Sequence, residues 1–302
     1  MIGSNLAYVA LASKDIAAAA RVLGSLLGLP RQDVTFAGTS APTFAIGRTA
    51  LVLFAPDDPF LGQGAQPGVH HIAFAAADPV SAGAALVESG FVITPGPGET
   101  VLVDPAATSG VRLRLAAALG LGLGHSERVE RLDHIGIASA DNQAAIATFC
   151  QRLDCPLESQ QTDMEVQMAV ESFTSDRYGV VYHSRPPVTV GGLRVAFITT
   201  GDCELEFLQN FDPHQAGEVA HGSEGTTRQD QGAITRFIAS RGTGLHHIAI
   251  KSPDIDRTLA HLHEAGLPMI DRKGRPGSRR AKIGFCHPHA LGGVLIHVVE
   301  RA

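Results

Sequence analysis

Several polar side chains interrupt apolar strand patterns in the second half of the chain. His134, Glu206, His247 and His297 stand in the segments LDHIGIA, LEFL, LHHIAI and GVLIHV. Because successive side chains of a strand point to opposite faces, the large apolar neighbours share one face and each polar side chain stands on the other. Imidazole nitrogens and carboxylate oxygens are donors that divalent metal ions take. Four strands that each aim one such donor into a shared cavity would form a metal site.

Internal repeats indicate how these strands are organised. The segment VHHIA from Val69 returns as LHHIA from Leu245, and LAYVALASKD from Leu6 returns as LDHIGIASAD from Leu132. A third pair is GVRLRL and GVLIHV, and the spacing between copies grows along the chain. Self-similarity of this kind indicates a duplication, with insertions in the second copy.

Each half repeats a smaller unit of one strand, one helix and two or three further strands. We expect the first strands of the four units over residues 6–12, 69–76, 132–138 and 245–251. We expect their helices from Asp15 to near Gly28 and over residues 79–89, 142–153 and 255–264. Gly28, Gly90 and Gly266 are typical residues at which a helix ends. The pattern predicts four βαβββ units and an α+β fold.

A glycine-rich stretch separates the two halves. The sequence AAALGLGLGHSER begins at Ala116, and its glycines are not preceded and followed by the strand and helix that a dinucleotide site requires. We therefore expect one domain over residues 1–118, a linker over 119–128 and a second domain over 129–302.

The motifs of the second half carry a family resemblance. LDHIGIA, LEFL, GTGLHHIAI and FCHPHALGGVLIHV, in this order, resemble methylmalonyl-CoA epimerase. More broadly they resemble the vicinal-oxygen-chelate superfamily, which includes glyoxalase I and the extradiol dioxygenases. The resemblance covers most of residues 132–300 and is weak but continuous in the first half. It implies two vicinal-oxygen-chelate domains, each made of paired βαβββ modules that form a cup, with one divalent metal in a cup.

The resemblance also implies a ligand set. The family positions fall on His134, Glu206, His247 and His297, and the last departs from the family because a glutamate is usual there. The same positions of the first half hold other residues, namely Tyr8, Val52, His71 and Arg114. Only one of these can bind a metal ion. We therefore expect one divalent ion per chain (Zn, Mn, Co, Ni or Fe(II)), held by the second half, and a degenerate first site.

Such a site leaves up to two positions open on a six-coordinate ion, which suits a substrate with two neighbouring oxygens. The ion would act as a Lewis acid, and proton transfer would need a positioned base. Glu206 itself and Glu204, which shares its strand face, are candidate catalytic carboxylates. His183 is a further candidate catalytic residue, and Tyr178 a candidate substrate contact.

A basic segment, RKGRPGSRRAK, lies between residues 272 and 282. Arginine forks bind carboxylates and phosphates, so Arg279, Arg280 and Lys282 are candidate contacts for an anionic substrate. The alternative is a solvated loop. No aromatic residues are interleaved with these charges, which argues against a single-stranded nucleic-acid site.

Composition limits the partners. The chain has 302 residues, 44% hydrophobic and 18% charged, and a formal net charge of −6. This balance is typical of a globular protein, and it attracts neither nucleic acid nor an anionic membrane. The N-terminus lacks a secretory signal pattern, so we expect a cytoplasmic location. A small-molecule substrate is the expected partner, and assembly into a homo-oligomer is left open.

Three functions compete. The first is a metal-dependent isomerase, epimerase or lyase of the glyoxalase I and methylmalonyl-CoA epimerase type, acting on a small, oxygen-rich, anionic substrate. The second is an Fe(II)-dependent extradiol or keto-acid dioxygenase, which the degenerate first half favours. The third is a binding protein without turnover, which would be expected to lack metal donors in both cups.

Overall fold

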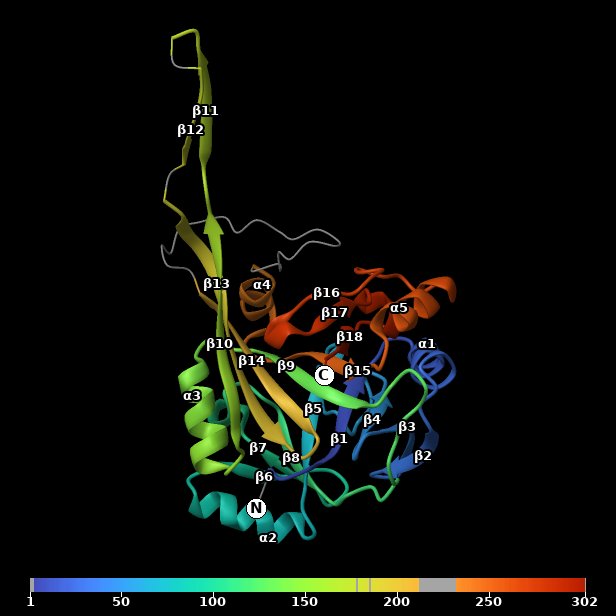
Figure 1. Cartoon of the computed structure of the whole chain (residues 1–302). Helices are drawn as coiled ribbons and strands as arrows, with labels where there is room; N and C mark the ends of the chain where they lie inside the picture. Colours follow the sequence, from blue (N-terminus) through green and yellow to red (C-terminus); the bar gives the residue numbers. More distant parts are fainter. Residues whose placement is uncertain (1–2, 178, 185, 212–231, 302) are drawn as a thin grey trace.

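The computed structural model describes residues 3–177, 179–184, 186–211 and 232–301. Two eight-stranded curled sheets and short helices make up the body, and a long two-stranded arm projects from it (Figure 1). The first half of the chain contains β1 (Leu6–Ala12), α1 (Ile16–Ala20), η1 (Arg21–Leu26), β2 (Arg31–Phe36), β3 (Thr39–Ile46), β4 (Thr49–Phe54), β5 (Gly68–Ala75), α2 (Pro79–Glu88), β6 (Ile93–Pro95), β7 (Val101–Val103), η2 (Pro105–Thr108) and β8 (Leu113–Ala116).

The second half repeats this order with additions. It contains β9 (Arg131–Ala138), α3 (Asn142–Ile146), η3 (Ala147–Arg152), β10 (Leu157–Gln167), β11 (Val170–Ser175), β12 (Gly179–Ser184), β13 (Val188–Thr200), β14 (Cys203–Phe211), α4 (Gly232–Arg241), β15 (Gly244–Lys251), α5 (Ile255–Glu264), β16 (Arg275–Pro276), η4 (Ser278–Arg280), β17 (Lys282–Phe285), η5 (Pro288–Leu291) and β18 (Ile296–Glu300). The repeated strands and helices expected from the sequence are confirmed, whereas α4 and the β11–β12 hairpin were not anticipated.

The two sheets have the same topology. Their strand orders are β2-β3-β4-β1-β5-β8-β7-β6 and β10-β13-β14-β9-β15-β18-β17-β16, which correspond strand for strand once the hairpin is set aside. In each sheet the first strand of one unit pairs antiparallel with the first strand of the next, through β1–β5 and β9–β15. The α+β fold with two cups of paired βαβββ modules is therefore confirmed.

Each module helix begins after an aspartate, which explains where the strand-to-helix turns occur. Asp15, Asp78, Asp141 and Asp254 accept hydrogen bonds from backbone N–H groups of the first turn. Such N-caps satisfy donors that have no partner within the helix. The predicted helix ends at Gly28, Gly90 and Gly266 are also confirmed, because these residues have φ of 75, 79 and 82°.

The main core lies on the helix-covered faces of both sheets. It forms one apolar cluster that includes Val9 and Leu51 of the first half and Ile135, Phe207 and Ile248 of the second. The residues expected on the apolar faces of the second-half strands therefore pack under the helices. The opposite faces of the two sheets are left to line the two cups.

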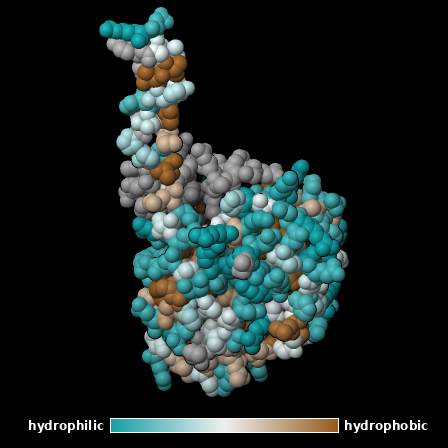
Figure 2. Space-filling model, viewed as in Figure 1, coloured by the Kyte–Doolittle hydropathy of each residue, from teal (hydrophilic) through white to brown (hydrophobic). Residues whose placement is uncertain are grey.

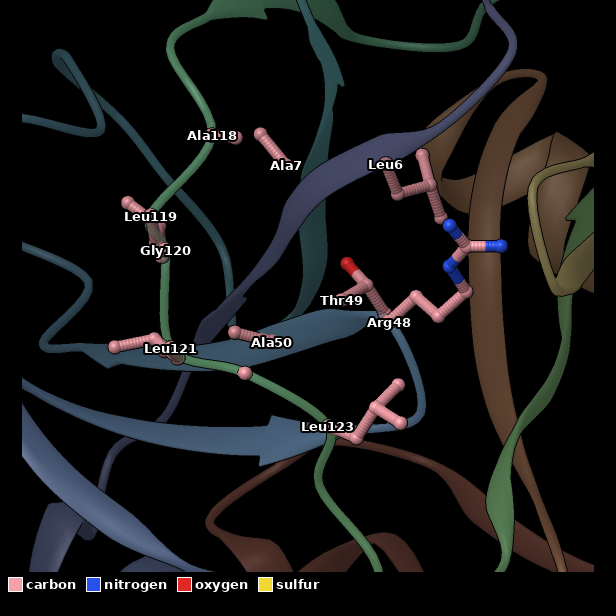
Figure 3. Close-up of a pocket in the computed structure, with 11 residues that line it drawn as sticks. Leu6, Ala7, Arg48, Thr49, Ala50, Ala118, Leu119, Gly120, Leu121 and Leu123 are labelled. Carbon is pink, nitrogen blue, oxygen red and sulfur yellow. The ribbon is translucent and has the colours of Figure 1, made fainter.

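A cavity of about 270 Å³ lies in the first half, beside the stretch that precedes the second sheet (Figure 3). Its walls come from the start of β1, the start of β4 and residues 118–123. They are apolar apart from Arg48 and Thr49, and none of the candidate metal ligands lies on them. The cavity is therefore not part of the candidate metal centre. Among the described residues no helix is long and apolar enough to cross a membrane.

Candidate metal centre

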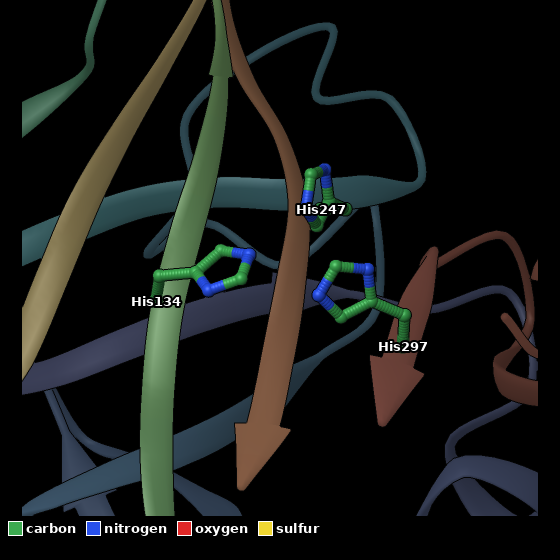
Figure 4. Close-up of side chains that lie close together, drawn as sticks. All are labelled: His134, His247 and His297. Carbon is green, nitrogen blue, oxygen red and sulfur yellow. The ribbon is translucent and has the colours of Figure 1, made fainter. Parts of the chain in front are cut away.

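Three histidines from three neighbouring strands meet in the second cup. His134 lies on β9, His247 on β15 and His297 on β18, and the side chains point toward one another (Figure 4). One potential ligand atom from each lies within 4.8 Å of the other two. The strand register explains the meeting, because Ala249 of the central strand pairs with both His134 and His297.

The three imidazoles are buried but not satisfied. Their residues are 3–4% exposed. The Nε2 atoms of His134 and His247 and both ring nitrogens of His297 have no hydrogen-bond partner within the described part of the chain. A buried polar atom without a partner costs roughly 1–3 kcal/mol. A metal ion bound by one nitrogen of each imidazole would satisfy three of these four atoms, so the residues fit a metal.

Glu206 supplies an oxygen at the same place. Its Oε2 atom lies 3.2 Å from His134 Nε2 and 3.7 Å from His247 Nε2, without the alignment of a hydrogen bond. The register of β14 with β9 sets Glu206 beside Gly136, two residues beyond His134. The structure thus brings together all four side chains that the sequence and the resemblance proposed as ligands.

The remaining nitrogen of two of these imidazoles has a partner that orients the ring. Asp133 Oδ1 lies 2.7 Å from His134 Nδ1, and His246 Nδ1 lies 3.0 Å from His247 Nδ1. Each contact leaves the Nε2 atom to face the cup. Metal-bound histidines commonly have such a partner on the second nitrogen, which sets tautomer and orientation.

Two β-bulges make these contacts possible. The pairing of β9 with β15 skips one residue at Asp133 and one at His246. A bulge adds a residue and re-aims its side chain, so strict alternation of faces fails there. Strict alternation along β15 would turn His246 away from His247, but the bulge brings their rings together, and the importance of Asp133 was missed. The double-histidine segment occurs in both halves, and the first half has the same irregularity at His70. The repeated double-histidine segment was therefore the sequence signal that could have indicated a bulge.

A glycine opposite His247 makes room for the ring. A Cβ atom placed on Gly136 would lie 2.0 Å from His247 Cε1. No side chain larger than hydrogen can stand there while the imidazole keeps its position. Gly136 is therefore a packing requirement of the candidate centre.

The acidic groups control the charge of the cluster. Burial opposes a proton on His134, but Glu206 and Asp133 outweigh it and raise its pKa to about 9. Burial and the neighbouring histidine charges lower the pKa of His247 and His297 well below the usual value. Burial also opposes ionisation of Asp133, yet its bond to His134 and the charges of Arg301 and Arg131 hold its pKa below the usual value.

Glu204 does not present a free carboxylate. Arg279 and Arg301 both bind it, and Arg301 also lies 2.8 Å from Asp133 Oδ1. Burial raises its pKa, but the hydrogen bonds and charges of the two arginines prevail and lower it. Arg301, the residue after β18, thus links Glu204 to Asp133, and the structure gives no support to the expected role of Glu204 as a base.

The basic segment divides between several roles. Arg279 binds Glu204 and Glu158 and stacks over Phe197 at 3.5 Å, so its fork is already engaged. Lys282 forms an ion pair with Glu300 and lies near Asp256 of α5. Both Lys282 and Glu300 are on the sheet face opposite to His297. Arg280 is exposed. Two of these three candidate contacts for an anionic substrate, Arg279 and Lys282, thus have intramolecular carboxylate partners, and substrate binding by the three stays a prediction.

Arg275 is a cation at the edge of the cup. Arg275 pairs with Ile283, which lies on the cup-lining face of the sheet together with Ala249 and Val299. The Arg275 guanidinium lies 5.5 Å from the centre of the Phe285 ring. That ring stands 4.4 Å from the His297 ring. Asp271 holds Arg275 Nε at 3.1 Å, while the buried Nη1 atom has no partner within the described residues. The sequence placed Arg275 in the basic segment without singling it out.

Two further candidates do not join the cluster. His183 lies on β12 of the projecting arm, is exposed and stands opposite Glu171. The arm extends away from the cups (Figure 1). Tyr178 lies outside the described residues.

The comparisons with known proteins agree with this architecture. A family model described as the Glyoxalase/Bleomycin resistance protein/Dioxygenase superfamily matches residues 133–286, about half of the chain. The chain belongs to this superfamily. The matched region includes His134, Glu206 and His247, and His297 lies beyond it.

Individual relatives cover different parts of the chain. Bacillus subtilis YqjC, described as an uncharacterized protein, is 26% identical over 172 residues, which are 57% of this chain and 93% of that protein. Mouse mitochondrial methylmalonyl-CoA epimerase is 23% identical over 130 residues, 43% of this chain and 64% of that one. A mutant 4-hydroxymandelate synthase from Streptomyces coelicolor aligns with 100% of this chain and 93% of its own, with a TM-score of 0.66 and 16% identity. That likeness shows a shared fold over the full length.

Proposed function

We propose that the second cup holds one divalent metal ion and that the protein is a metal-dependent isomerase, epimerase or lyase. The observation that supports this most is the meeting of three buried histidines, His134, His247 and His297, within 4.8 Å. Glu206 adds a fourth donor at 3.2 Å from the first of them. A divalent ion bound there would polarise a substrate carbonyl and favour loss of a proton from the adjacent carbon.

The number of donors favours this chemistry over oxygenation. Non-haem Fe(II) oxygenases typically use two histidines and one carboxylate, which leaves room for both substrate and dioxygen. This cup offers a third histidine, His297, in addition to such a set. Four protein donors suit a substrate that contributes two neighbouring oxygens and no second reactant.

Residues of the cup have separate tasks in this proposal. Glu206 lies against the cluster and has no arginine partner among the described residues, so it is the proposed proton acceptor. Arg275 Nη1 is buried and unpartnered within the described residues, and it would bind an anionic group of the substrate. Phe197 and Phe285 stand against His134 and His297 and would limit the access of water.

Deuterium exchange tests the proposed reaction. Protein loaded separately with Zn, Mn, Co or Ni is incubated in D₂O with small 2-oxo and acyl-thioester carboxylates, and exchange at the carbon next to the carbonyl is followed by NMR. Exchange without oxygen uptake is expected, and Glu206→Gln should abolish it with the metal still bound. Arg275→Ala should raise KM more than it lowers kcat, because uniform binding is lost.

One observation favours the dioxygenase alternative, namely the full-length likeness in fold to 4-hydroxymandelate synthase. If His297 did not bind the metal, the donors would reduce to His134, Glu206 and His247. Stoichiometric oxygen consumption by the Fe(II)-loaded protein, unchanged in His297→Ala, would contradict the isomerase proposal and support the alternative.

A further inference from the structure

A two-stranded arm is the feature of the fold that the metal site leaves unexplained. β10 and β13 run beyond the second sheet, and the ribbon continues as β11 paired with β12 (Figure 1). In the described part of the chain β11 and β12 form a sheet of their own, without a third strand. Isolated two-stranded ribbons are marginally stable in water at best.

The arm exposes apolar side chains at regular positions. They follow one another at every second residue from Met164 to Val170, and two more lie on β12: Met164 63%, Val166 56%, Met168 64%, Val170 59%, Val180 57% and Tyr182 74% exposed. Seven of the thirteen large exposed apolar residues of the described chain lie between 164 and 188. Figure 2 shows hydrophobic residues along the arm, beyond a largely hydrophilic body.

The β11–β12 register shows that part of this stripe shares one face. Val170, Ser172 and Thr174 are alternate residues of one strand, and their partners are Ser184, Tyr182 and Val180. Paired residues point to the same side of a ribbon, so Val170, Tyr182 and Val180 lie together. We name the six exposed residues, Met164, Val166, Met168, Val170, Val180 and Tyr182, the arm stripe.

We propose that the arm stripe is covered by the arm of a second copy of this chain, related by a twofold axis. An apolar surface of this extent normally marks an interaction site. A twofold interface uses the same patch on both subunits, so an uncharged stripe on a projecting ribbon complements itself without repulsion.

Area and charge support this partner. At on the order of 100 Å² per side chain, two stripes would bury about 1,200 Å², the lower end of the range for specific protein interfaces. An anionic membrane is a poorer match, because the exposed charged residues of β11 and the adjoining turn, Glu171, Asp176 and Arg177, carry a net charge of −1 and the chain carries −6. The twofold arrangement also closes after two copies and leaves no arm uncovered.

Sedimentation equilibrium of the full chain tests the proposal. We expect a dimer at protein concentrations on the order of 10 µM. Val170→Asp combined with Tyr182→Asp should weaken dimerisation at least about 100-fold, because the carboxylates would be buried without partners. The matched control is Val80→Asp with Val87→Asp, two valines of α2 that are 68% and 51% exposed. The control should stay dimeric.

Cross-linking provides a second measurement that does not depend on how the charged variant folds. Met168→Cys lies near the middle of the arm stripe and should form an intermolecular disulfide under mild oxidation, whereas Val80→Cys should not. A wild-type protein that is monomeric over this concentration range would overturn the proposal. So would a dimer that the arm variants leave unchanged, or equal cross-linking of the two cysteine variants.

Discussion

The two cups share a backbone plan and differ in the side chains that fill it. In both sheets the four equivalent positions have the same register: Ala10 pairs with Val52 and His71, as Gly136 pairs with Glu206 and His247. Arg114 faces Ala73 as His297 faces Ala249. The correspondence inferred from the sequence repeats is thus present in the structure. The fold supplies four positions that point into a cup, and the residue types decide what the cup can bind.

The first cup is filled rather than open to a metal. Tyr8, Phe36, Phe54 and Phe60 pack together with ring centroids 5.1–5.4 Å apart. Arg114 donates a hydrogen bond to the Phe60 carbonyl and lies 4.6 Å from the centre of its ring. Burial raises the pKa of Tyr8 to about 12, so its phenol stays neutral. A buried cation and an aromatic cluster disfavour a second cation in this cup.

The largest expected contrast is between His247→Ala and His71→Ala. Loss of His247 removes one of the proposed metal ligands. Loss of a residue that only supports a ligand lowers metal affinity by up to about 100-fold, so loss of the ligand itself should lower it by at least that factor. His71→Ala should leave metal content near one ion per chain. Elemental analysis after dialysis measures both. Two tightly held ions in the wild-type protein, or equal losses in the two variants, would abolish the distinction between the cups.

The next contrast tests whether the His247 ring needs the space that Gly136 leaves beside it. Gly136→Ala would place a Cβ 2.0 Å from His247 Cε1, so the imidazole must move away from its partners. Metal affinity should fall by about 10-fold or more, because the supporting geometry is lost. The matched change in the first cup is Ala10→Gly at the equivalent register position, and it should not affect metal affinity. Wild-type affinity in Gly136→Ala would show that the observed ring position is not the binding position.

A smaller effect is expected from Asp133→Asn, which keeps the size of the side chain but removes its charge. The hydrogen bond to His134 Nδ1 would weaken, and metal affinity should fall about 10-fold, the lower end of what losing a supporting partner costs. Asp254→Asn changes an exposed helix cap, whose carboxylate accepts a hydrogen bond from the Arg257 backbone N–H, and serves as the control. Titration calorimetry with Zn²⁺ or Co²⁺ measures the difference. If both variants bind alike, Asp133 does not orient the ring.

The smallest effect concerns the first cup and pH. Burial and the charges of Arg112 and Arg114 lower the pKa of His70 to about 3, so the folded state keeps this imidazole neutral. The unfolded chain takes up the proton near pH 6.5. The contribution of neutral His70 to the free energy of unfolding is therefore fully present above about pH 6.5. It is lost as the pH falls from about 6.5 toward 3.

Urea unfolding at pH 7 and pH 5, with a chelator present, measures this loss. His70 should account for roughly 1–2 kcal/mol of the decrease in unfolding free energy, and His70→Gln should reduce the decrease by that amount. Identical decreases in the wild-type protein and His70→Gln would show that the imidazole is not held neutral in the folded state.

Much of the fold and of the candidate centre could be predicted from the sequence. Repeated motifs and apolar alternation predicted the module strands and helices, because period-two burial and helix-ending glycines are local properties. The same alternation placed His134, Glu206, His247 and His297 on one face. Local patterns decide the face of a side chain wherever the strand is regular.

Several features of the candidate centre depend on contacts between distant segments, so only the tertiary structure decided them. The bulges at Asp133 and His246 arise from the pairing of β9 with β15, so no pattern within one strand reveals them. Arg279 pairs with Glu204 across 75 residues, and Lys282 faces α5 because β17 pairs with β18. Ion pairs, bulges and the exposure of the arm follow from which strands become neighbours. The sequence by itself determined which donors the chain carries and which strand faces they occupy, and chain pairing decided which of them meet.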